Sequence, residues 1–466
     1  MHSQQSQSGQ TSQPEQSACY QYACLCNGGY PQQPTPAPTP VKKKKRFLKC
    51  VGMIFLGILI FFAGALSHYF SLDGEIRALI QVKNRIQREY YEQLTDEQFY
   101  DAVFGGINNL LDDYSGYLSP DEYFNVIMRA TGKQIGIGVS FYANATGDDA
   151  LKIVQVTGNS PAERLGLLAG ERIVGYGANE NELQTANSYD AFVDFISDYE
   201  EGETFCLRIL SASEQERNVT IARESYLASY VTYRTNNTAY RFVDGQNLKK
   251  TTYGQPLETL DSQTAYIRLT GFNGKAAEEF ALAMTAFRDD GMKNLVLDLR
   301  GNGGGYLDTM LEIASYLGKD APYGAVAAIA DYGEKRENFS IKSSLYTHYF
   351  QTDSRVCVLA DSGTASASEC LIGFMCDYGT ISYGDICLSQ RGDQVRTYGK
   401  GIMQTTYPLL FANGGAIKIT TAKILWPVSG NCIHGRGVLV SDGTLQVAEN
   451  PDDEAELRAA IDALFS

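Results

Sequence analysis

The chain contains little histidine and, beyond its first 49 residues, too little positive charge to balance its acids. Its four histidines are His2, His68, His348 and His434, and none lies in a motif typical of serine proteases that use histidine as the general base. The net charge is −15, and because the first 49 residues hold six basic residues against one acidic residue, the remainder carries −20. An acidic body of this kind argues against nucleic-acid binding, so we expect no nucleic-acid partner.

The sequence also lacks the motifs that bind nucleotides or structural metal ions. Residues 301–305 (Gly-Asn-Gly-Gly-Gly) connect an apolar strand to a helix, which is a setting for a phosphate-binding loop. The spacing fits neither a P-loop nor a dinucleotide-binding fingerprint. Cys19, Cys24 and Cys26 lack a fourth cysteine or histidine at the spacing of a zinc finger, so a thiol-bearing tail is the preferred interpretation. We therefore expect no metal ion and no organic cofactor.

The cysteines of the main body have two interpretations. They could form disulfides outside the cell, although their pairing cannot be read from the sequence; they are Cys206, Cys357, Cys370, Cys376, Cys387 and Cys432. Cys370 begins an apolar helical run, and we predict a small buried side chain there rather than a nucleophile.

The first 70 residues have the pattern of a polar tail and a membrane anchor. Residues 1–46 are rich in Gln, Ser, Pro and Thr, and we expect them to be disordered. Residues 47–70 approach the roughly 20 apolar residues that cross a bilayer. A cleaved signal peptide is the alternative, because Ala63-Gly64-Ala65 offers the small residues of a cleavage site. The basic residues before the apolar run favour a single-pass anchor in the plasma membrane, with the tail in the cytoplasm and the body outside.

The pattern changes twice between residues 71 and 222. Residues 71–130 alternate charged and apolar positions in helical fashion, are interrupted by a turn at 112–120, and show nothing catalytic. Residues 131–222 read as a separate domain of short strands and turns, with a helix near Tyr189–Tyr199. In this domain the glycine-flanked segment Gly136-Ile137-Gly138-Val139 begins a strand.

Residues 223–466 predict a mixed α/β domain. Polar residues 223–262 read as edge strands or a hairpin, without chemistry. The near-continuous apolar runs at 294–299 and 356–360 suit strands of a buried sheet, and helical patterns follow at 276–288, after Leu307 and at 452–464. Because ligands gather at the carboxyl ends of such strands, chemistry is expected beyond residues 299 and 360.

Ser366 lies where an apolar helix begins, in the sequence Thr-Ala-Ser-Ala-Ser-Glu. A serine at this position can be a nucleophile whose oxyanion is met by free backbone N–H groups. It can equally be a helix cap, because Ser366 and Glu369 have the spacing of a capping box.

A serine nucleophile needs a general base, and Lys400 is the candidate. A lysine can replace histidine if burial lowers its pKa far enough for the amine to be neutral near pH 7. Gly399 and Gly401 flank Lys400 and allow the backbone to approach closely. If residues 400–404 are extended, Lys400 and Gln404 share one face, and Gln404 could hold the amine.

These residues together resemble the carboxyl-terminal processing peptidases, also called tail-specific proteases. The resemblance rests on Thr-Ala-Ser-Ala-Ser-Glu followed by Gly-Lys-Gly-x-x-Gln and covers roughly residues 75–466. It implies that Ser366 is the nucleophile, Lys400 the general base and Gln404 the residue that orients the lysine. It further implies that the backbone N–H groups of Gly304 and Ala367 form the oxyanion hole. The segment 385–397 is longer than is usual in the family, and Thr364 stands where serine is common.

The same resemblance assigns residues 131–222 to a PDZ domain. The supporting pattern is Ser-Pro-Ala, Gly-Leu and Gly-Glu-x-Ile after residue 159, with Glu171 where aspartate is usual. The loop Gly136, Ile137, Gly138 and Val139 would then hold the terminal carboxylate of a peptide that adds as a strand. A tight turn in a small barrel is the structural alternative.

The implied function is a membrane-anchored serine endopeptidase with its catalytic domain outside the cytoplasm. Its partners would be protein or peptide substrates with free carboxyl-terminal tails, and a homodimer is left open. One alternative is an inactive PDZ scaffold, although Ser366, Lys400 and Gln404 are all retained. A second is a hydrolase based on Cys370, which predicts sensitivity to thiol reagents.

Overall fold

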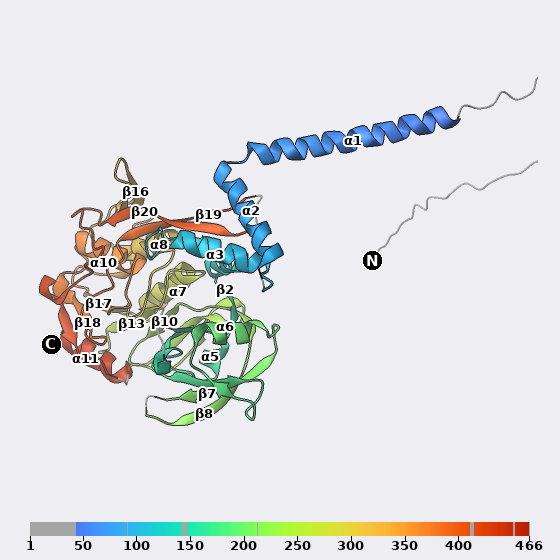
Figure 1. Ribbon diagram of the computed structural model, residues 1–466. Coiled ribbons are helices and arrows are strands. Elements are labelled where there is room, and N and C mark those ends of the chain that lie inside the picture. Colours follow the sequence, from blue (N-terminus) through green and yellow to red (C-terminus); the bar gives the residue numbers. More distant parts are fainter. Residues whose placement is uncertain are drawn as a thin grey trace, which may run out of the picture. The chain divides into compact units, whose positions relative to one another are not determined.

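The computed structural model describes residues 43–90, 92–141, 147–211, 213–410, 414–450 and 453–465. These residues belong to two compact units, 1–95 and 96–466. Most of the expected tail, with Cys19, Cys24 and Cys26, lies outside the described residues. Figure 1 shows the order of the elements.

The first unit contains two helices, α1 (Lys43–Ser71) and α2 (Gly74–Glu89). Within α1, Val51–Ser71 is long and apolar enough to cross a membrane, with a mean hydropathy of 2.1. The Asp73 carboxylate accepts a hydrogen bond of 2.8 Å from the Glu75 N–H and so caps α2. One apolar N-terminal helix is therefore present, which suits either an anchor or a signal sequence.

The second unit begins with α3 (Asp96–Asn108), the short strand β1 (Gly116–Leu118) and α4 (Pro120–Thr131). Ser119 caps α4 through a complete capping box with Glu122. Strand β1 was not expected in a helical segment. It exists because its partner is β20, some 300 residues later, and no local pattern records that pairing.

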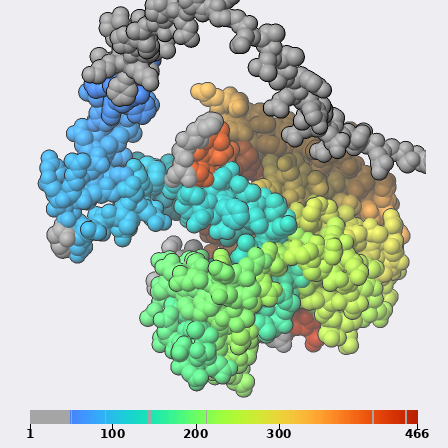
Figure 2. Space-filling view, turned by 90° about the vertical axis from the view of Figure 1, so that its right-hand side faces the viewer, coloured from blue at the N-terminus to red at the C-terminus, as the bar shows by residue number. Residues whose placement is uncertain are grey.

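Residues 132–227 form a small β-rich subdomain with its own core. Helix α6 (Tyr189–Ser197) covers a four-stranded antiparallel sheet in the order β6-β5-β7-β8. The bounds of its strands are β2 Lys133–Gly136, β3 Val139–Phe141, β4 Ile153–Val156, β5 Arg172–Gly177, β6 Gln184–Thr185, β7 Thr204–Leu210, β8 Glu216–Ala222 and β9 Glu224–Leu227, with helix α5 at Pro161–Arg164 and a 3-10 turn at Gly147–Asp149. The core includes Leu151, Phe192, Phe205 and Leu207. In Figure 2 this green surface forms a lobe below the cyan surface of the segment that ends in α4.

The largest sheet has eight strands in the order β12-β11-β10-β13-β14-β17-β18-β21. Strands β13 to β21 of this order are parallel, and β10 to β12 are antiparallel. Their bounds are β10 Val231–Arg234, β11 Ala239–Asp244, β12 Asn247–Thr252, β13 Thr264–Leu269, β14 Asn294–Asp298, β17 Val356–Ala360, β18 Ile386–Ser389 and β21 Leu445–Val447. The expected buried strands are thus present, and the predicted mixed α/β class is confirmed.

Helices cover both faces of this sheet. Alternate strand residues point to opposite sides, so Leu295 and Leu297 pack with α7 (Ala276–Asp289), α8 (Leu307–Leu317) and α10 (Ala367–Asp377), whereas Val296 packs with α11 (Asp453–Phe465). Short helical turns at Tyr346–Tyr349, Tyr383–Asp385 and Val440–Asp442 link the elements.

A second sheet carries the general-base candidate. Its order is β1-β20-β15-β16, with β19 also paired to β20; the bounds are β15 Val326–Asp331, β16 Arg336–Ser340, β19 Ile402–Pro408 and β20 Ala416–Leu425. The β19–β20 register shifts between Met403 and Gln404. This bulge re-aims the side chains of β19 next to Lys400.

Candidate active site

Ser366 is presented at a strained turn between β17 and α10. Its backbone has φ 58° and ψ −116°, and only Asn159 and Glu214 share a positive φ among the described residues other than glycine. Such a conformation costs on the order of 1–3 kcal/mol and persists only where its surroundings enforce it. The Ser366 side chain makes no hydrogen bond that caps α10. The reciprocal contact of a capping box is present, because the Ser366 N–H donates to the Glu369 carboxylate at 3.0 Å.

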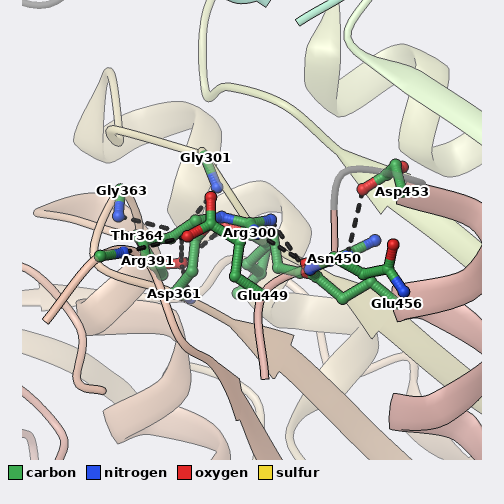
Figure 3. Close-up of polar contacts among 12 residues, drawn as sticks. Arg300, Gly301, Asp361, Gly363, Thr364, Arg391, Glu449, Asn450, Asp453 and Glu456 are labelled. Atoms are coloured by element: carbon green, nitrogen blue, oxygen red, sulfur yellow. Dashed lines mark hydrogen bonds and ion pairs between the residues drawn. The ribbon is translucent and has the colours of Figure 1, made fainter. Parts of the chain in front are cut away.

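The loop before Ser366 is held by Asp361 and Thr364. Asp361 Oδ1 accepts from the N–H groups of Gly301 at 2.8 Å and Gly363 at 3.0 Å (Figure 3). The Thr364 hydroxyl accepts from the Asp361 N–H at 2.9 Å and donates to the Leu299 carbonyl at 2.8 Å. Both bonds involve only the hydroxyl group, so the serine that is common at position 364 could make the same two contacts.

A buried ion cluster lies beneath this loop. Arg300 is 1% exposed and pairs with Asp298 at 2.7 Å and with Glu456 of α11 at 2.8 Å. Burial alone would raise the pKa of Asp298, but the guanidinium groups of Arg300 and Arg268 hold it at about 2. Arg391, from the long segment 385–397, pairs with both Glu456 and Asp361 (Figure 3). That segment thus contributes to the support of the serine loop.

Glu369 connects the serine and the lysine. Its Oε2 accepts from the Ser366 N–H at 3.0 Å and from the Lys400 N–H at 2.9 Å. Its Oε1 accepts from the Thr397 hydroxyl at 2.6 Å and the Gly399 N–H at 2.8 Å. Burial raises the pKa of Glu369, and these four hydrogen bonds oppose the rise. Because one oxygen binds both amides, the backbones of Ser366 and Lys400 are held side by side.

The Lys400 amine is half-buried and directed at Gln404. Lys400 Nζ donates to Gln404 Oε1 at 2.8 Å, and Gln404 Nε2 donates to the carbonyl of Tyr114. Burial is the main reason that the pKa of Lys400 is lowered; the charge of Lys418 adds to this, and Asp112 opposes it. Lys400 precedes β19, and the β19–β20 register shifts just before Gln404, so residues 400–404 are not the single regular strand that the alternation of side chains would require. No hydrogen bond joins the Ser366 hydroxyl to the Lys400 amine within the described residues.

The glycines beside Lys400 have a steric role. A Cβ on Gly399 would lie 2.9 Å from the Gly437 nitrogen, and a Cβ on Gly401 would lie 2.7 Å from the His434 nitrogen. Gly399 also has a φ of 89°. Only glycine lets the 433–437 segment pack this closely on the backbone around Lys400.

Gly304 and Ala367, the expected oxyanion residues, lie next to Ser366. A Cβ on Gly304 would lie 2.8 Å from Ser366 Cβ and 3.0 Å from the Ala367 nitrogen. Ala367 is the first residue of α10, where N–H groups lack partners within the helix. The Gly304 N–H donates to Asn302 Oδ1 at 2.9 Å. The buried Asn302 carbonyl in turn accepts from the Ala365 N–H at 3.0 Å and so ties the glycine loop to the serine loop.

The segment Gly136 to Val139 connects β2 to β3 in the small subdomain. Gly136 and Gly138 have positive φ, and a Cβ on Gly138 would lie 2.1 Å from Ser160 Cβ. Ile137 is buried, and its carbonyl accepts from the Ala162 N–H at 2.9 Å. Among the described residues, β3 pairs in its sheet with β4 only.

Sequence reasoning missed three residues of this site. Tyr114 was placed in a segment without chemistry, Asp361 was not singled out, and Glu369 was considered only as a capping partner. Glu369 alone had a local signal, its spacing from Ser366. Cys370, in contrast, is a free buried thiol whose pKa burial raises to about 12, as expected for a small core residue. The other five cysteines of the body are also free thiols here.

Comparisons with known proteins bear on the same region. Residues 263–440 match the family model described as peptidase family S41. This part of the chain is a peptidase S41 domain. A CtpA-like serine protease from Staphylococcus haemolyticus is 26% identical over 443 residues, covering 88% of this chain and 79% of that protein. A second, from Staphylococcus aureus, is 27% identical over 369 residues, covering 78% and 64%.

A solved structure shares the fold of this S41 peptidase. The photosystem II D1 C-terminal processing protease aligns with a TM-score of 0.50 and 21% identity, covering 83% of this chain and 94% of that one. With serine protease relatives, the protein is a hydrolase that acts on proteins or peptides.

Proposed function

We propose that this S41 peptidase is a membrane-anchored serine endopeptidase with a Ser366–Lys400 dyad. The observation that supports it best is the single Glu369 oxygen that binds the N–H groups of both residues. It joins the backbone of the proposed nucleophile to that of Lys400, and burial lowers the pKa of the Lys400 amine. The proposal requires the Ser366–Lys400 hydrogen bond to form when substrate binds, as catalytic hydrogen bonds often do.

In the proposed mechanism the neutral Lys400 amine takes the Ser366 hydroxyl proton as Ser366 Oγ bonds to the scissile carbonyl carbon. The C–N bond then breaks, and the Lys400 ammonium returns its proton to the leaving amine. Water attacks the acyl-enzyme and Lys400 accepts the water's proton. The C–Oγ bond then breaks, and Lys400 returns that proton to Oγ, which restores the Ser366 hydroxyl and the neutral amine. Gln404 Oε1 accepts a hydrogen bond from one N–H of the Lys400 amine. The nitrogen lone pair then points away from Gln404 and is left to accept the Ser366 proton.

The oxyanion of each tetrahedral intermediate is assigned to the N–H groups of Ala367 and Gly304. Two backbone donors at a helix start suit this charge. The Gly304 N–H must turn from Asn302 or be shared with it. The substrate's developing charge provides a stronger acceptor than a neutral amide oxygen.

We further propose that the small subdomain is a PDZ domain that receives the substrate's tail. The loop Gly136, Ile137, Gly138 and Val139 would bind the terminal carboxylate, and the tail would add to the open edge of β3. The apolar α1 would anchor the chain in the plasma membrane, with residues 1–46 in the cytoplasm.

The dyad is tested with full-length protein in detergent micelles, using β-casein as substrate. Ser366→Ala and Lys400→Ala are each expected to lower kcat by at least about 10³-fold, because each removes a group that acts in every step. Cys370→Ala is the matched control and should keep activity. Unchanged cleavage by Ser366→Ala would rule out the dyad and favour the Cys370 mechanism, whereas the absence of cleavage by the wild type would favour an inactive scaffold.

Tail recognition is tested with one peptide substrate in two forms, free acid and carboxyl-terminal amide. Amidation removes the charge that the loop would bind and should lower kcat/KM by about tenfold or more, as expected when a charged hydrogen bond is lost. Equal kcat/KM for the two forms would show that the terminal carboxylate is not recognised.

A further inference from the structure

Tyr114 lies in the turn between α3 and β1, far from the catalytic motifs in sequence. The Asp112 carboxylate accepts from the Tyr114 N–H at 3.1 Å, which forms a local turn. Ser115 Oγ accepts from the N–H of Thr420 at 2.9 Å, and Thr420 is the ladder partner of Gln404. Strand β1 then pairs with β20. The turn is therefore fixed against the part of the sheet that carries Gln404.

Tyr114 makes two different contacts with the general-base pair. Its backbone carbonyl accepts from Gln404 Nε2, and its ring centroid lies 5.0 Å from Lys400 Nζ. The first contact fixes which end of the Gln404 amide faces the lysine. If the Gln404 amide were turned over, its NH₂ group would face the Lys400 amine, and two hydrogen-bond donors would oppose each other. The bulge at Met403 and Gln404 makes this geometry specific to one position of β19.

The second contact concerns the hydration of the amine. The charged or titratable groups around Lys400 include Lys418 from β20, Asp112 and Tyr114 from the turn, Tyr398 beside the Tyr114 hydroxyl, Glu369 at the Lys400 N–H, and His434, whose ring centroid lies 6.4 Å from that of the Tyr114 ring. Lys418 and Asp112 act in opposite directions, so burial decides the pKa of the amine. The Tyr114 ring supplies part of that burial. A ring at this distance also attracts the ammonium form, which opposes the effect of burial on the pKa. Desolvation shifts reach several pKa units, so uncovering the amine has the larger effect.

We propose that Tyr114 is a positioning residue for the general base: its carbonyl orients Gln404, and its ring keeps water from the Lys400 amine. The inference rests on the proposed Ser366–Lys400 dyad. It brings residues 112–115, from a segment in which the sequence shows nothing catalytic, into the active site.

The test uses the full-length protein in detergent micelles and a fluorophosphonate probe in place of an unidentified substrate. Labelling forms a bond between Ser366 Oγ and phosphorus, breaks the P–F bond with loss of fluoride, and transfers the hydroxyl proton to the base. The pH at half-maximal labelling rate therefore reports the pKa of the base. Cleavage of β-casein gives kcat and KM for the same proteins.

Tyr114→Ala is expected to raise the pH at half-maximal labelling rate by about one unit. Because one pKa unit is a tenfold change in the neutral fraction of the amine, kcat at pH 7 should fall by about tenfold. KM should stay within about twofold of the wild-type value. Tyr114→Phe keeps ring and carbonyl and should retain the original midpoint. Tyr117→Leu is the control, because Tyr117 stacks on Phe104 with centroids 3.9 Å apart in the same segment and does not cover the amine.

The outcomes separate this inference from the dyad itself. A Tyr114→Ala protein with an unshifted midpoint overturns the inference, whether or not its rate falls, because a purely structural role lowers rate without moving the pKa. An equal shift in Tyr117→Leu overturns it as well. If Tyr114→Ala does not fold, as judged by thermal unfolding, Tyr114→Leu must show the upward shift. Labelling of Lys400→Ala at the wild-type rate would instead refute the dyad.

Discussion

At the scale of single residues, the strain at Ser366 and the absence of a side chain at Gly304 belong together. The serine turn brings Ser366 Cβ to 2.8 Å from where a Gly304 Cβ would stand, and the Ala365 carbonyl to 2.9 Å. Both distances are shorter than any normal contact of a Cβ atom. Gly304 also has a φ of 99°, which favours glycine. The two loops can meet only with glycine at this position.

We therefore expect Gly304→Ala to lower kcat by about 10²-fold or more and the free energy of unfolding by about 1–3 kcal/mol, the range for enforced backbone strain and a displaced oxyanion donor. Chemical denaturation and β-casein cleavage measure the two effects. Gly303→Ala is the control, since a Cβ there meets nothing within 4 Å. Equal behaviour of the two variants would contradict the steric account.

Residue roles could be predicted where the chemistry is local in sequence. Ser366, Lys400 and Gln404 were named from two short motifs, and their roles stay predictions until tested. The contact of Gln404 with Tyr114 spans 290 positions. Nothing in the spacing of either segment records it, because it depends on β1 pairing with β20. For the same reason Arg391 could be recognised as an extra polar residue and not as a partner of Glu456.

At the scale of elements, α7 holds the segment that joins the small subdomain to the large sheet. The completely buried Glu279 accepts from Ser229 Oγ at 2.8 Å and from the N–H groups of Tyr230 and Val231 at 3.1 and 3.2 Å. Burial raises the pKa of Glu279 to about 7, and these hydrogen bonds oppose the rise only in part. The joint between β9 and β10 is thus linked to a carboxyl that titrates near neutral pH.

The sign of the resulting pH dependence is fixed. The folded protein binds this proton more tightly than the unfolded chain, so the contribution of Glu279 to stability is complete below the ordinary value of 4.5 and is lost as pH rises through about 7. The whole effect is about 3 kcal/mol, at about 1.4 kcal/mol for each pKa unit.

We expect Glu279→Gln to remove this part of the slope of unfolding free energy against pH between 4.5 and 7. Denaturant titrations at several pH values measure it as the difference from the wild type. Glu278→Gln is the matched control on the same helix, because the Glu278 side chain is 44% exposed and pairs with Lys275 at the surface. Parallel pH curves for Glu279→Gln and the wild type would show that the carboxyl does not titrate in this range.

Helices and strands could be predicted where a local run or a regular spacing of apolar residues marks the buried side of the element. The apolar runs that became β14 and β17, and the periodic segments that became α7 and α11, have local patterns that the folded sheet preserves. Strand order is different. It places β10, from a segment read as an edge or hairpin, between β11 and β13 inside the eight-stranded sheet. Hydrogen bonding between distant strands decides this, and it leaves no periodic trace in the sequence.

At the scale of the whole molecule, chemistry and membrane attachment are assigned to different units of the chain. Every residue proposed for catalysis or tail binding lies in the unit of residues 96–466, as do the three hydrophobic cores. The unit of residues 1–95 contributes the one described helix that could cross a membrane. The basic residues precede the apolar segment Val51–Ser71 of this helix, whereas the acidic charge follows it. This separation predicts that activity and attachment can be divided.

A chain that begins at Asp96 is expected to fold, to cleave β-casein with a kcat within about threefold of the full-length value, and to remain in the supernatant when membranes are sedimented. The reason is that this chain keeps all three hydrophobic cores and loses the apolar helix. Burial of that helix in lipid, at about 25 cal/mol per Å² of apolar surface, is the interaction that would hold the full-length protein in the membrane. A chain that begins at Val41 is the control: it keeps α1 and must sediment with membranes and resist extraction at high salt and high pH. If the Asp96 chain also sediments, another surface binds the membrane. If the full-length protein is recovered in the supernatant with its amino terminus after Ala65, the apolar helix is a cleaved signal and not an anchor.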